Sequence, residues 1–309
     1  MTFGHFLKWL DYHVILKAGG YMPPAWAYRM ARIRAAYRYR SRHLVREAAR
    51  RHLRLAFPER TDPELERMVR DFFISPCMDE QETFFQPRLT LTGIRHFVDL
   101  QGVDQIHRCL SRGKGAIVFS AHNASVCLFA SIHGLLGFKT SAIVRPVDPV
   151  NDVLHPVVRT FAFKRQQWME KILQRPYLSP GPGDLRKVIR CLEANEIVIA
   201  LLDVPPELSR KKIAVDFFGK KCLFPAGIVR LAEETGCGLI FCRKEYHPGW
   251  NRLTLQWEEA IYSTGNLRAD MQKCIGRMED MVRHQPSQWY WWDCFPMLWA
   301  PEGPSDVDG

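Results

Sequence analysis

Three short apolar stretches in the middle of the chain each lead to a polar or charged residue. They are residues 116–119, 140–144 and 197–202, and His122, Arg145 and Asp203 follow them. Short apolar runs bounded by glycine or turn residues are typical of buried strands. The segments between them have the length and pattern of helices. This alternation predicts an α/β fold with a mixed, mainly parallel central sheet flanked by helices.

The same pattern extends over the rest of the chain. The first expected helix spans residues 61–73, with Thr61 or Asp62 as its N-cap and a break after it at Ser75-Pro76. The other expected helices are residues 128–136, 152–173, 184–194, 225–235 and 267–284. Further strands are expected at 215–218, 238–242 and 253–257. We expect one domain, made of an N-terminal helical segment (1–90), a core (91–300) and a flexible polar tail (301–309).

Composition narrows the class of protein. The chain has 43 Lys and Arg against 33 Asp and Glu, a net charge of +10, and it is 47% hydrophobic, which excludes a disordered chain. Its nine cysteines are scattered, without a C-x-x-C pair or a His/Cys cluster at zinc spacing, so we expect reduced thiols and no metal. No secretory signal and no uninterrupted apolar run of about 18 residues is present, so no membrane-spanning helix is expected.

The N-terminal part combines apolar and cationic residues. Residues 3–16 are largely apolar, which fits either a helix on a membrane surface or a first helix packed on the domain. Arginine recurs at every fourth position from Arg34 to Arg54 and predicts one amphipathic helix with a cationic face. Anionic lipid, an acidic carrier protein, nucleic acid or solvent alone would suit this face. We favour the membrane surface and expect no nucleic acid, because no nucleic-acid-binding motif is present.

Candidate functional residues follow from the predicted sheet. In open α/β sheets, ligands bind outside the carboxyl ends of the strands. His122, Arg145 and Asp203 all follow such ends. Each also has an ordinary explanation, as a turn histidine, a solvated arginine or a helix-capping aspartate. Their common position nevertheless predicts a site.

Several segments resemble the bacterial lipid A biosynthesis acyltransferases, the lauroyl/myristoyl transferase family. The similar segments, in order, are Leu53–Glu59, Gly113–His122, Val144–Pro149, Ala200–Asp203, Val215–Gly219 with Phe224–Ala232, and Gln285–Trp292. Each segment alone is a weak signal. Six in the right order, spanning roughly residues 5–295, make the chain similar to this family over most of its length.

The resemblance implies a specific activity. Members transfer a fatty acyl chain from acyl carrier protein, sometimes from coenzyme A, to a hydroxyl of a lipid at the cytosolic face of the inner membrane. Neither a metal nor a cofactor is required. A histidine, here His122, removes the proton of the acceptor hydroxyl, and a carboxylate five residues later orients the imidazole. We therefore expect a peripheral inner-membrane acyltransferase whose partners are a lipid or glycolipid acceptor and an acyl carrier protein or acyl-CoA donor.

This chain departs from the family pattern at one position. Cys127 stands where the carboxylate is expected, and no acid lies between His122 and Asp148. Four explanations remain open. In the first, His122 works alone or with support from Asn123, Ser125 or a carboxylate borrowed from Asp203; in the second, Cys127 carries the acyl group itself. In the third, the acceptor is an amine or thiol. In the fourth, catalysis is lost and the protein binds lipid or a partner. A buried apolar role for Cys127 is the ordinary alternative.

Further residues are candidates for substrate binding. Arg145 suits a phosphate of the acceptor or of the carrier's phosphopantetheine, or else an ion pair with Asp148 or Asp203. Phe217, Phe218 and Gly219 belong to a segment that resembles the family, and the nearby lysines (Lys211, Lys212, Lys220 and Lys221) suit either a lipid headgroup or an ordinary hairpin surface. The C-terminal tryptophans (Trp289, Trp291, Trp292 and Trp299) either line the acyl groove, anchor at the interface or pack in the core.

Overall fold

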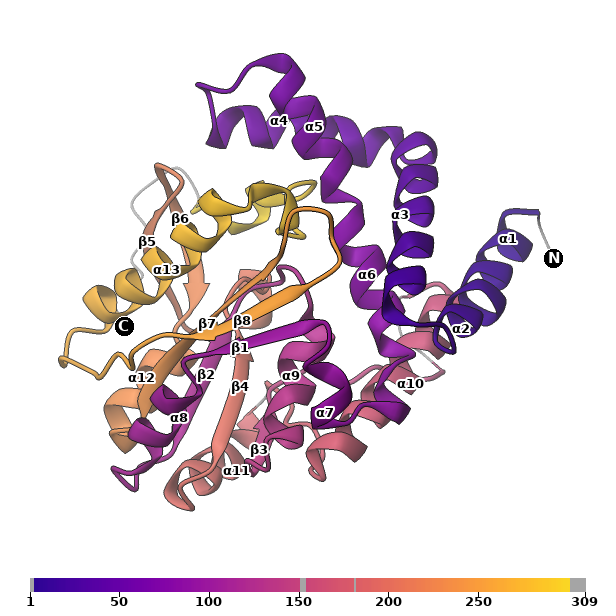
Figure 1. Cartoon of the computed structure of the whole chain (residues 1–309). Coiled ribbons are helices and arrows are strands. Elements are labelled where there is room, and N and C mark those ends of the chain that lie inside the picture. Colours follow the sequence, from indigo (N-terminus) through magenta and orange to yellow (C-terminus); the bar gives the residue numbers. More distant parts are fainter. Residues whose placement is uncertain (1–2, 151–153, 181, 301–309) are drawn as a thin grey trace.

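A six-stranded sheet forms the centre of the molecule in the computed structural model, which describes residues 3–150, 154–180 and 182–300 (Figure 1). Its strand order is β1-β8-β7-β2-β4-β3. The strands are β1 (Val98–Gln101), β2 (Ala116–Ser120), β3 (Thr140–Ala142), β4 (Ile197–Leu201), β7 (Gly238–Tyr246) and β8 (Leu253–Trp257). The mixed, mainly parallel sheet expected from the sequence is confirmed.

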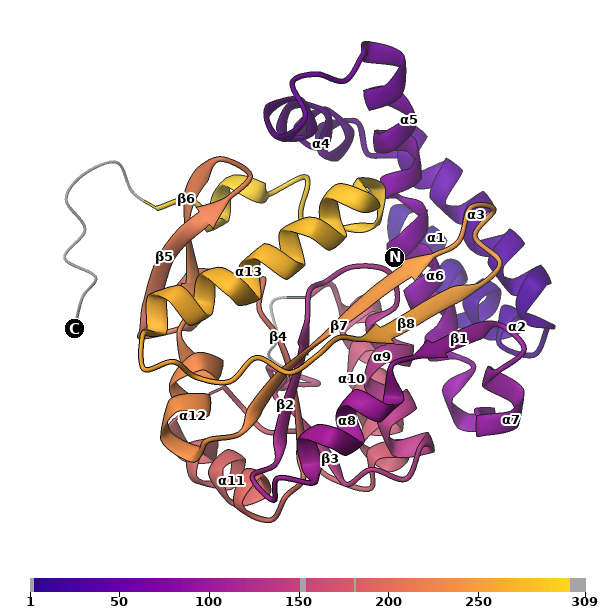
Figure 2. The same cartoon turned by 60° about the vertical axis from the view of Figure 1, so that its left-hand side comes forward.

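Strand direction brings the expected site residues to one edge of the sheet. β2 pairs in parallel with β4 and β7, and β3 pairs in parallel with β4. The carboxyl ends of β2, β3 and β4 therefore point the same way. The sheet is mixed because β8 runs antiparallel to β7, as the long β7–β8 hairpin of Figure 2 shows. β1 pairs in parallel with β8, so it also runs opposite to β7.

Helices cover both faces of this sheet. α9 packs against α6 and α10, whereas α12 packs against α11 and α13. The helices after β1 are α8 (Val103–Leu110), α9 (Val126–Leu135), α10 (Pro156–Leu173), α11 (Pro182–Glu193), α12 (Gly227–Thr235) and α13 (Leu267–His284), and short helical turns are η3 (Pro206–Leu208), η4 (Pro286–Gln288) and η5 (Phe295–Leu298). Within the described residues, α13 has the predicted bounds and α10 starts at Pro156, whereas residues 152 and 153 of that predicted helix lie outside the described residues.

A separate two-stranded hairpin replaces the single strand predicted at 215–218. It consists of β5 (Lys212–Phe217) and β6 (Lys220–Pro225), paired antiparallel so that Phe217 faces Lys220. The two residues between these ends, Phe218 and Gly219, have positive φ angles of 50° and 70°. Two consecutive positive φ angles are those of a tight turn that matches the twist of hairpin strands. The Phe-Phe-Gly sequence is therefore explained by hairpin geometry.

The N-terminal helices form a layer beside the sheet. They are α1 (Phe3–Leu10), the π-helical turn η1 (Asp11–Ile15), α2 (Leu16–Gly19), α3 (Pro24–Ser41), α4 (His43–Ala56), α5 (Asp62–Phe72) and α6 (Ile74–Thr83), followed by η2 (Gln86–Arg88) and α7 (Leu91–Ile94). Buried side chains of α3 to α6 are continuous with the core around the sheet. The tail expected to be flexible, 301–309, lies outside the described residues.

The prediction of one cationic helix is wrong in two respects. The helix breaks at Arg42, which separates α3 from α4. Moreover, Arg34 and Arg38 are buried, because both pair with Glu80 of α6, at 2.7 and 2.8 Å. Arg34 also pairs with Asp11 at 2.5 Å. Of the six arginines in the predicted face, Arg42 at the break and Arg46, Arg50 and Arg54 of α4 are the ones that are not buried.

The helix after residue 60 starts as predicted but ends earlier. Thr61 caps α5 in a reciprocal arrangement with Glu64. The break lies at Phe73, and α6 continues through Ser75 and Pro76, contrary to the prediction. Pro76 is the third residue of α6, where a missing backbone N–H leaves no helical hydrogen bond unmade.

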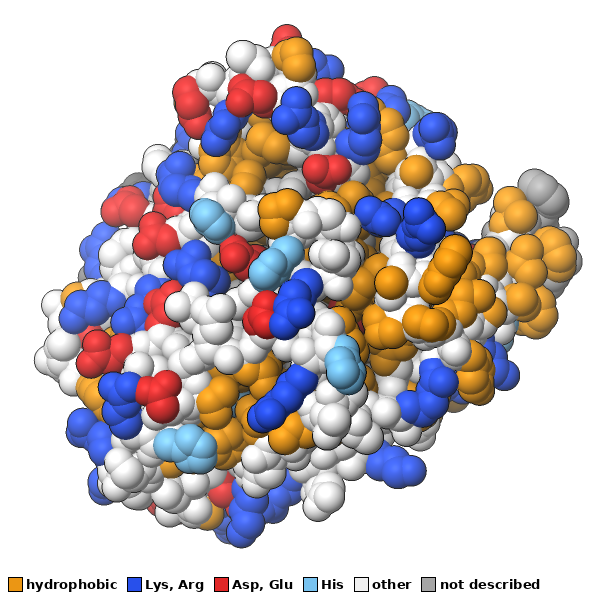
Figure 3. All heavy atoms as spheres, in the orientation of Figure 1, with side chains coloured by type: hydrophobic (Ala, Val, Ile, Leu, Met, Phe, Trp, Pro, Cys, Tyr) orange, Lys and Arg blue, Asp and Glu red, His pale blue; other side chains and the backbone are white. Residues whose placement is uncertain are grey.

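Large apolar side chains are unusually exposed in the N-terminal layer. Most of those exposed among the described residues lie before residue 56: Phe6, Trp9, Val14, Tyr21, Met22, Trp26, Ile33, Tyr37, Leu44 and Leu55. Figure 3 shows hydrophobic side chains gathered on the side of the molecule where α1 and α3 lie. In the described part of the chain, every helix is too short or too polar to cross a bilayer.

Candidate active site

His122 and Asp203 meet at the carboxyl edge of the sheet. Ser120 and Leu201, the last residues of β2 and β4, are paired in register, and the two site residues each lie two positions beyond. The His122 Nδ1 lies 2.9 Å from the Asp203 Oδ1. The backbone N–H of His122 donates to both carboxylate oxygens, at 2.9 and 2.7 Å. One carboxylate thus holds both the backbone and the ring of the histidine.

The surroundings of Asp203 keep it ionised. Its side chain is fully buried and also accepts a hydrogen bond from the Trp289 indole N–H, at 2.8 Å. Burial raises the pKa of Asp203, but the charge of His122 and the hydrogen bonds from His122 and Trp289 outweigh it and lower the pKa below its usual value. An ionised carboxylate only accepts, so Nδ1 of His122 is the donor of this hydrogen bond and Nε2 is the ring nitrogen that is not bonded to Asp203.

The C-terminal segment fixes the position of His122 from the other side. The Tyr290 backbone N–H donates to the His122 carbonyl at 2.8 Å, and the Trp291 ring packs edge-on against the imidazole, with centroids 4.9 Å apart. Two residues after His122, Ala124 has a φ of +46°, a conformation that non-glycine residues rarely adopt. The Tyr290 hydroxyl donates to the carbonyl of this strained residue. The histidine loop is therefore held in one conformation.

His122 lines a large cavity of about 950 Å³ beside this edge. The cavity lies at the upper end of the size range of small-molecule sites. Its walls come from β4, α10, α11 and α12 and are mostly apolar, with Met169, Leu185, Val188, Ile228 and Leu231 among them. Such walls suit a long hydrocarbon chain.

Five described cationic side chains line the cavity: Arg145, Arg165, Arg210, Lys211 and Arg230. Arg145 lines it, at the end of β3 as the sequence predicted. Arg165 of α10, which sequence reasoning missed, also lines it and pairs with Asp79 of α6 at 2.7 Å. The other oxygen of Asp79 accepts from the backbone N–H groups of Val126 and Cys127, both at 2.8 Å. Asp79 therefore joins the first turn of α9 to an arginine of the cavity wall.

The Cys127 thiol is directed into the protein interior. It is fully buried, accepts a hydrogen bond from the Gln86 amide at 2.6 Å and lies 3.8 Å from the Thr83 hydroxyl. Burial raises the pKa of this thiol far above its usual value, which disfavours the thiolate needed for nucleophilic attack. The cavity lining includes Val126 but not Cys127.

Asn123 and Ser125 are also buried and do not line the cavity. The Asn123 amide donates to the Lys244 carbonyl at 3.0 Å. Ser125 is the N-cap of α9, accepting from Leu128 N–H, and it donates to Glu82. Their contacts shape the loop after His122 rather than a ligand surface.

Phe217, Phe218 and Gly219 lie away from the cavity lining. Phe217 and Phe218 pack in an aromatic cluster with Trp289, Trp292 and Phe295. Among the C-terminal tryptophans only Trp291 lines the cavity, whereas Trp299 packs on Phe295. The expected headgroup rim is the β5–β6 hairpin, where Lys221 pairs with Asp216 at 2.8 Å. The structure thus gives Phe217 and Phe218 packing contacts and places Gly219 in the hairpin turn, and no ligand contact follows from it.

Two buried ionisable side chains, Glu82 and Lys244, contact the segment that carries His122. Glu82 accepts hydrogen bonds from the hydroxyls of Tyr28 (2.6 Å) and Tyr246 (2.8 Å), and burial, together with the charge of Asp79, raises its pKa to about 8. Lys244 donates to the Ala121 carbonyl at 2.9 Å, and burial lowers its pKa to about 8. No local pattern in the sequence marks either residue, because their partners lie on other elements.

His122, held by the buried carboxylate of Asp203, thus lies beside a mostly apolar cavity. The family model of bacterial lipid A biosynthesis acyltransferases matches residues 2–293, and the chain belongs to this family. It is an acyltransferase.

Characterised relatives agree with this assignment. The chain is 24% identical over 260 residues, 83% of its length and 81% of the relative's, to a phosphatidylinositol mannoside acyltransferase of Mycolicibacterium smegmatis. It is also 24% identical over 256 residues, 79% of its length and 76% of the relative's, to the lipid A biosynthesis palmitoleoyltransferase of Escherichia coli and to a lipid A biosynthesis acyltransferase of Shigella flexneri.

Proposed function

We propose that this protein transfers a fatty acyl chain from a thioester donor, acyl carrier protein or acyl-CoA, to a hydroxyl of a lipid or glycolipid. The observation that carries the proposal is the hydrogen bond between His122 and the buried Asp203, with His122 facing the large apolar cavity. The relatives named above are acyltransferases of phosphatidylinositol mannoside and of lipid A, which supports this class of acceptor.

The reaction needs a base, because an unactivated hydroxyl is a poor nucleophile. Nε2 of His122 takes the hydroxyl proton while the acceptor oxygen attacks the thioester carbonyl. The tetrahedral intermediate collapses, the C–S bond breaks, and the imidazolium returns its proton to the leaving sulfur. Asp203 stabilises the imidazolium and keeps the ring oriented, a positioning contribution that needs no carboxylate at residue 127.

The cavity supports the binding of the two substrates. Its apolar walls suit the acyl chain, and Arg145 and Arg165 suit a phosphate of the donor's pantetheine arm or of the acceptor. The apolar side chains exposed on the N-terminal layer support peripheral association with a membrane, which we place at the cytosolic face of the bacterial inner membrane.

The test is an acyl-transfer assay with a matched histidine control. Wild type, His122→Gln and His96→Gln are incubated with acyl carrier protein or CoA thioesters and with lipid extracts of E. coli or M. smegmatis, and acylated lipid is measured by mass spectrometry. His96 is exposed and lies outside both the cavity lining and the His122 contacts. We expect transfer by wild type and His96→Gln and a loss of about 10²- to 10⁴-fold in His122→Gln. Equal rates in all three proteins would refute His122 as the base.

A further inference from the structure

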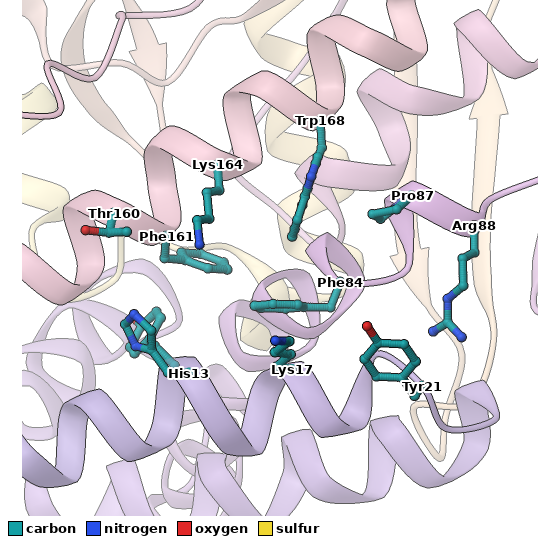
Figure 4. A pocket seen from close by; sticks show the side chains of 11 residues that line it. His13, Lys17, Tyr21, Phe84, Pro87, Arg88, Thr160, Phe161, Lys164 and Trp168 are labelled. Carbon is teal, nitrogen blue, oxygen red and sulfur yellow. The ribbon is translucent and has the colours of Figure 1, made fainter.

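A second cavity, of about 410 Å³, lies between the N-terminal helices and α10. Figure 4 shows His13, Lys17 and Tyr21 on one side, Thr160, Phe161, Lys164 and Trp168 of α10 on the other, Phe84 between the two sides, and Pro87 and Arg88 at one end. It shares no lining residue with the active-site cavity, which meets α10 at Ala162, Arg165, Gln166 and Met169. Different faces of the same helix thus line two separate cavities.

Positive charge gathers around this second cavity without a compensating acid. Lys17, Lys164 and Arg88 line it together with His13, and no Asp or Glu is among the lining residues. Within the described part of the chain, neither Lys17 nor Lys164 forms an ion pair, and Arg88 lies over the Tyr21 ring, 4.8 Å from its centroid. A cluster of unneutralised cations around a concave site favours an anionic ligand.

The aromatic side chains form a wall rather than a slot. The Phe84 ring stacks on Phe161 with centroids 5.8 Å apart and meets Trp168 edge-on at 5.6 Å. These separations are those of rings in direct contact, so no planar base fits between them. A continuous apolar wall suits a flexible hydrocarbon chain better than a nucleotide.

The surroundings of the cavity point to a membrane as the source of the ligand. Phe6, Trp9 and Val14 of the first helices, Met22 of the turn that follows them and Trp26 of α3 expose 40% to 59% of their surface. Neighbouring hydrophobic side chains cover this side of the molecule (Figure 3). Apolar side chains that flank cationic ones are typical of a surface that lies in the lipid interface.

We propose that the cavity between the N-terminal helices and α10 binds one anionic membrane phospholipid. Its phosphate lies among Lys17, Lys164 and Arg88, and the upper part of an acyl chain lies along Phe84, Phe161 and Trp168. This site is distinct from the acyl-transfer site and holds a lipid that is not consumed. It does not depend on the proposed roles of His122 and Asp203.

Fluorescence quenching tests the proposal on the full chain. Vesicles of phosphatidylcholine contain phosphatidylglycerol with bromine atoms near the carbonyl end of its chains, which quench nearby tryptophans. Subtraction of the quenching in Trp168→Phe from that in wild type isolates the signal of Trp168 from that of the exposed Trp9 and Trp26. The lysine variant is Lys17→Gln/Lys164→Gln. Its matched control is Lys139→Gln/Lys273→Gln, two exposed lysines outside both cavities with the same change in net charge.

We expect saturable quenching of Trp168 and an affinity about fivefold lower for each cavity lysine removed, with a much smaller change in the control pair. Three results would overturn the proposal. The first is equal quenching in wild type and Trp168→Phe, and the second is an equal loss of vesicle affinity in the two double-lysine variants. The third is reversal of the quenching by inorganic phosphate at the concentration of the lipid, which would make the ligand a free anion. Melting temperatures establish that each variant is folded. No acyl donor is present, so the outcome is independent of catalysis.

Discussion

Asp203 binds the backbone N–H and the imidazole Nδ1 of His122 with one carboxylate, although 81 residues separate the two in sequence. The adjacency of β2 and β4 makes this contact possible, because residues beyond their paired ends meet outside the sheet. The orienting carboxylate therefore comes from a neighbouring strand and not from the helix that follows the histidine. Its removal should disturb both the position and the charge balance of the ring.

Asp203→Asn is expected to lower kcat about 10²- to 10⁴-fold and also to lower the melting temperature, because the amide nitrogen faces a donor from which the carboxylate accepts. The amide oxygen can still accept from a backbone N–H, but it carries no charge to stabilise the imidazolium. Steady-state acyl-transfer rates and thermal unfolding together check this prediction. An unchanged kcat in a folded variant would show that His122 works without Asp203.

Cys127→Ser is expected to keep most of the wild-type kcat and to form no covalent adduct. The thiol is buried against Gln86, and a hydroxyl can accept the same hydrogen bond. Intact-protein mass spectrometry after incubation with the acyl donor alone provides the check. An acyl adduct on wild type that disappears in Cys127→Ser would instead establish a covalent route.

Asp79→Ala is expected to lower the free energy of unfolding by about 3 kcal/mol, because it leaves the partly buried Arg165 without its charged partner and removes the acceptor for two N–H groups of α9. Asp104→Ala is a suitable control, since Asp104 and Arg108 form an exposed pair within α8 whose loss should cost much less stability. Urea unfolding measures both. Similar losses in the two variants would contradict a structural role for Asp79.

Glu82 is expected to make stability depend on pH. Its pKa of about 8 in the folded protein lies above the ordinary value of 4.5, so between these values the folded state holds a proton that the unfolded state has released. The free energy of unfolding should therefore fall as pH rises from about 4.5 to about 8, by at most about 1.4 kcal/mol per pH unit. In Glu82→Gln this component should be absent. Parallel pH profiles of urea unfolding for the two proteins would refute the raised pKa.

Phe218→Ala is expected to destabilise the protein by about 3–5 kcal/mol without raising KM for the acyl donor. The ring contacts Phe57, Trp292 and Phe295 and carries the Arg283 guanidinium 4.5 Å from its centroid. Denaturation and donor-saturation curves separate the two effects. A raised KM at a temperature where the variant is folded would return Phe218 to the substrate-binding residues.

The hydrophobic pattern of the sequence predicted the two strands that lead to the candidate site. Apolar runs located β2 and β4, and parallel pairing then put the residues beyond them, His122 and Asp203, side by side. The catalytic roles of these residues stay predictions. The pairing of Asp79 with Arg165 could not be predicted, because nothing near either residue indicates its partner.

The N-terminal arginines show the same limit. The four-residue spacing of Arg34 and Arg38 is identical for an exposed face and for a buried one, and only the distant Asp11 and Glu80 decide between them. The short strand β1 was missed for a related reason. It contains Asp99, whose charge is compensated by Arg252 just before β8.

The two edges of the described sheet are its shortest strands, since β1 has four residues and β3 has three. An edge strand exposes unpaired backbone groups that another chain can extend into a shared sheet. Edges of this length give such a chain only a few hydrogen bonds. The long apolar strands β2, β4 and β7 are paired on both sides or lie within the sheet. Self-association through strand addition to the six-stranded sheet should consequently require partial unfolding of that sheet.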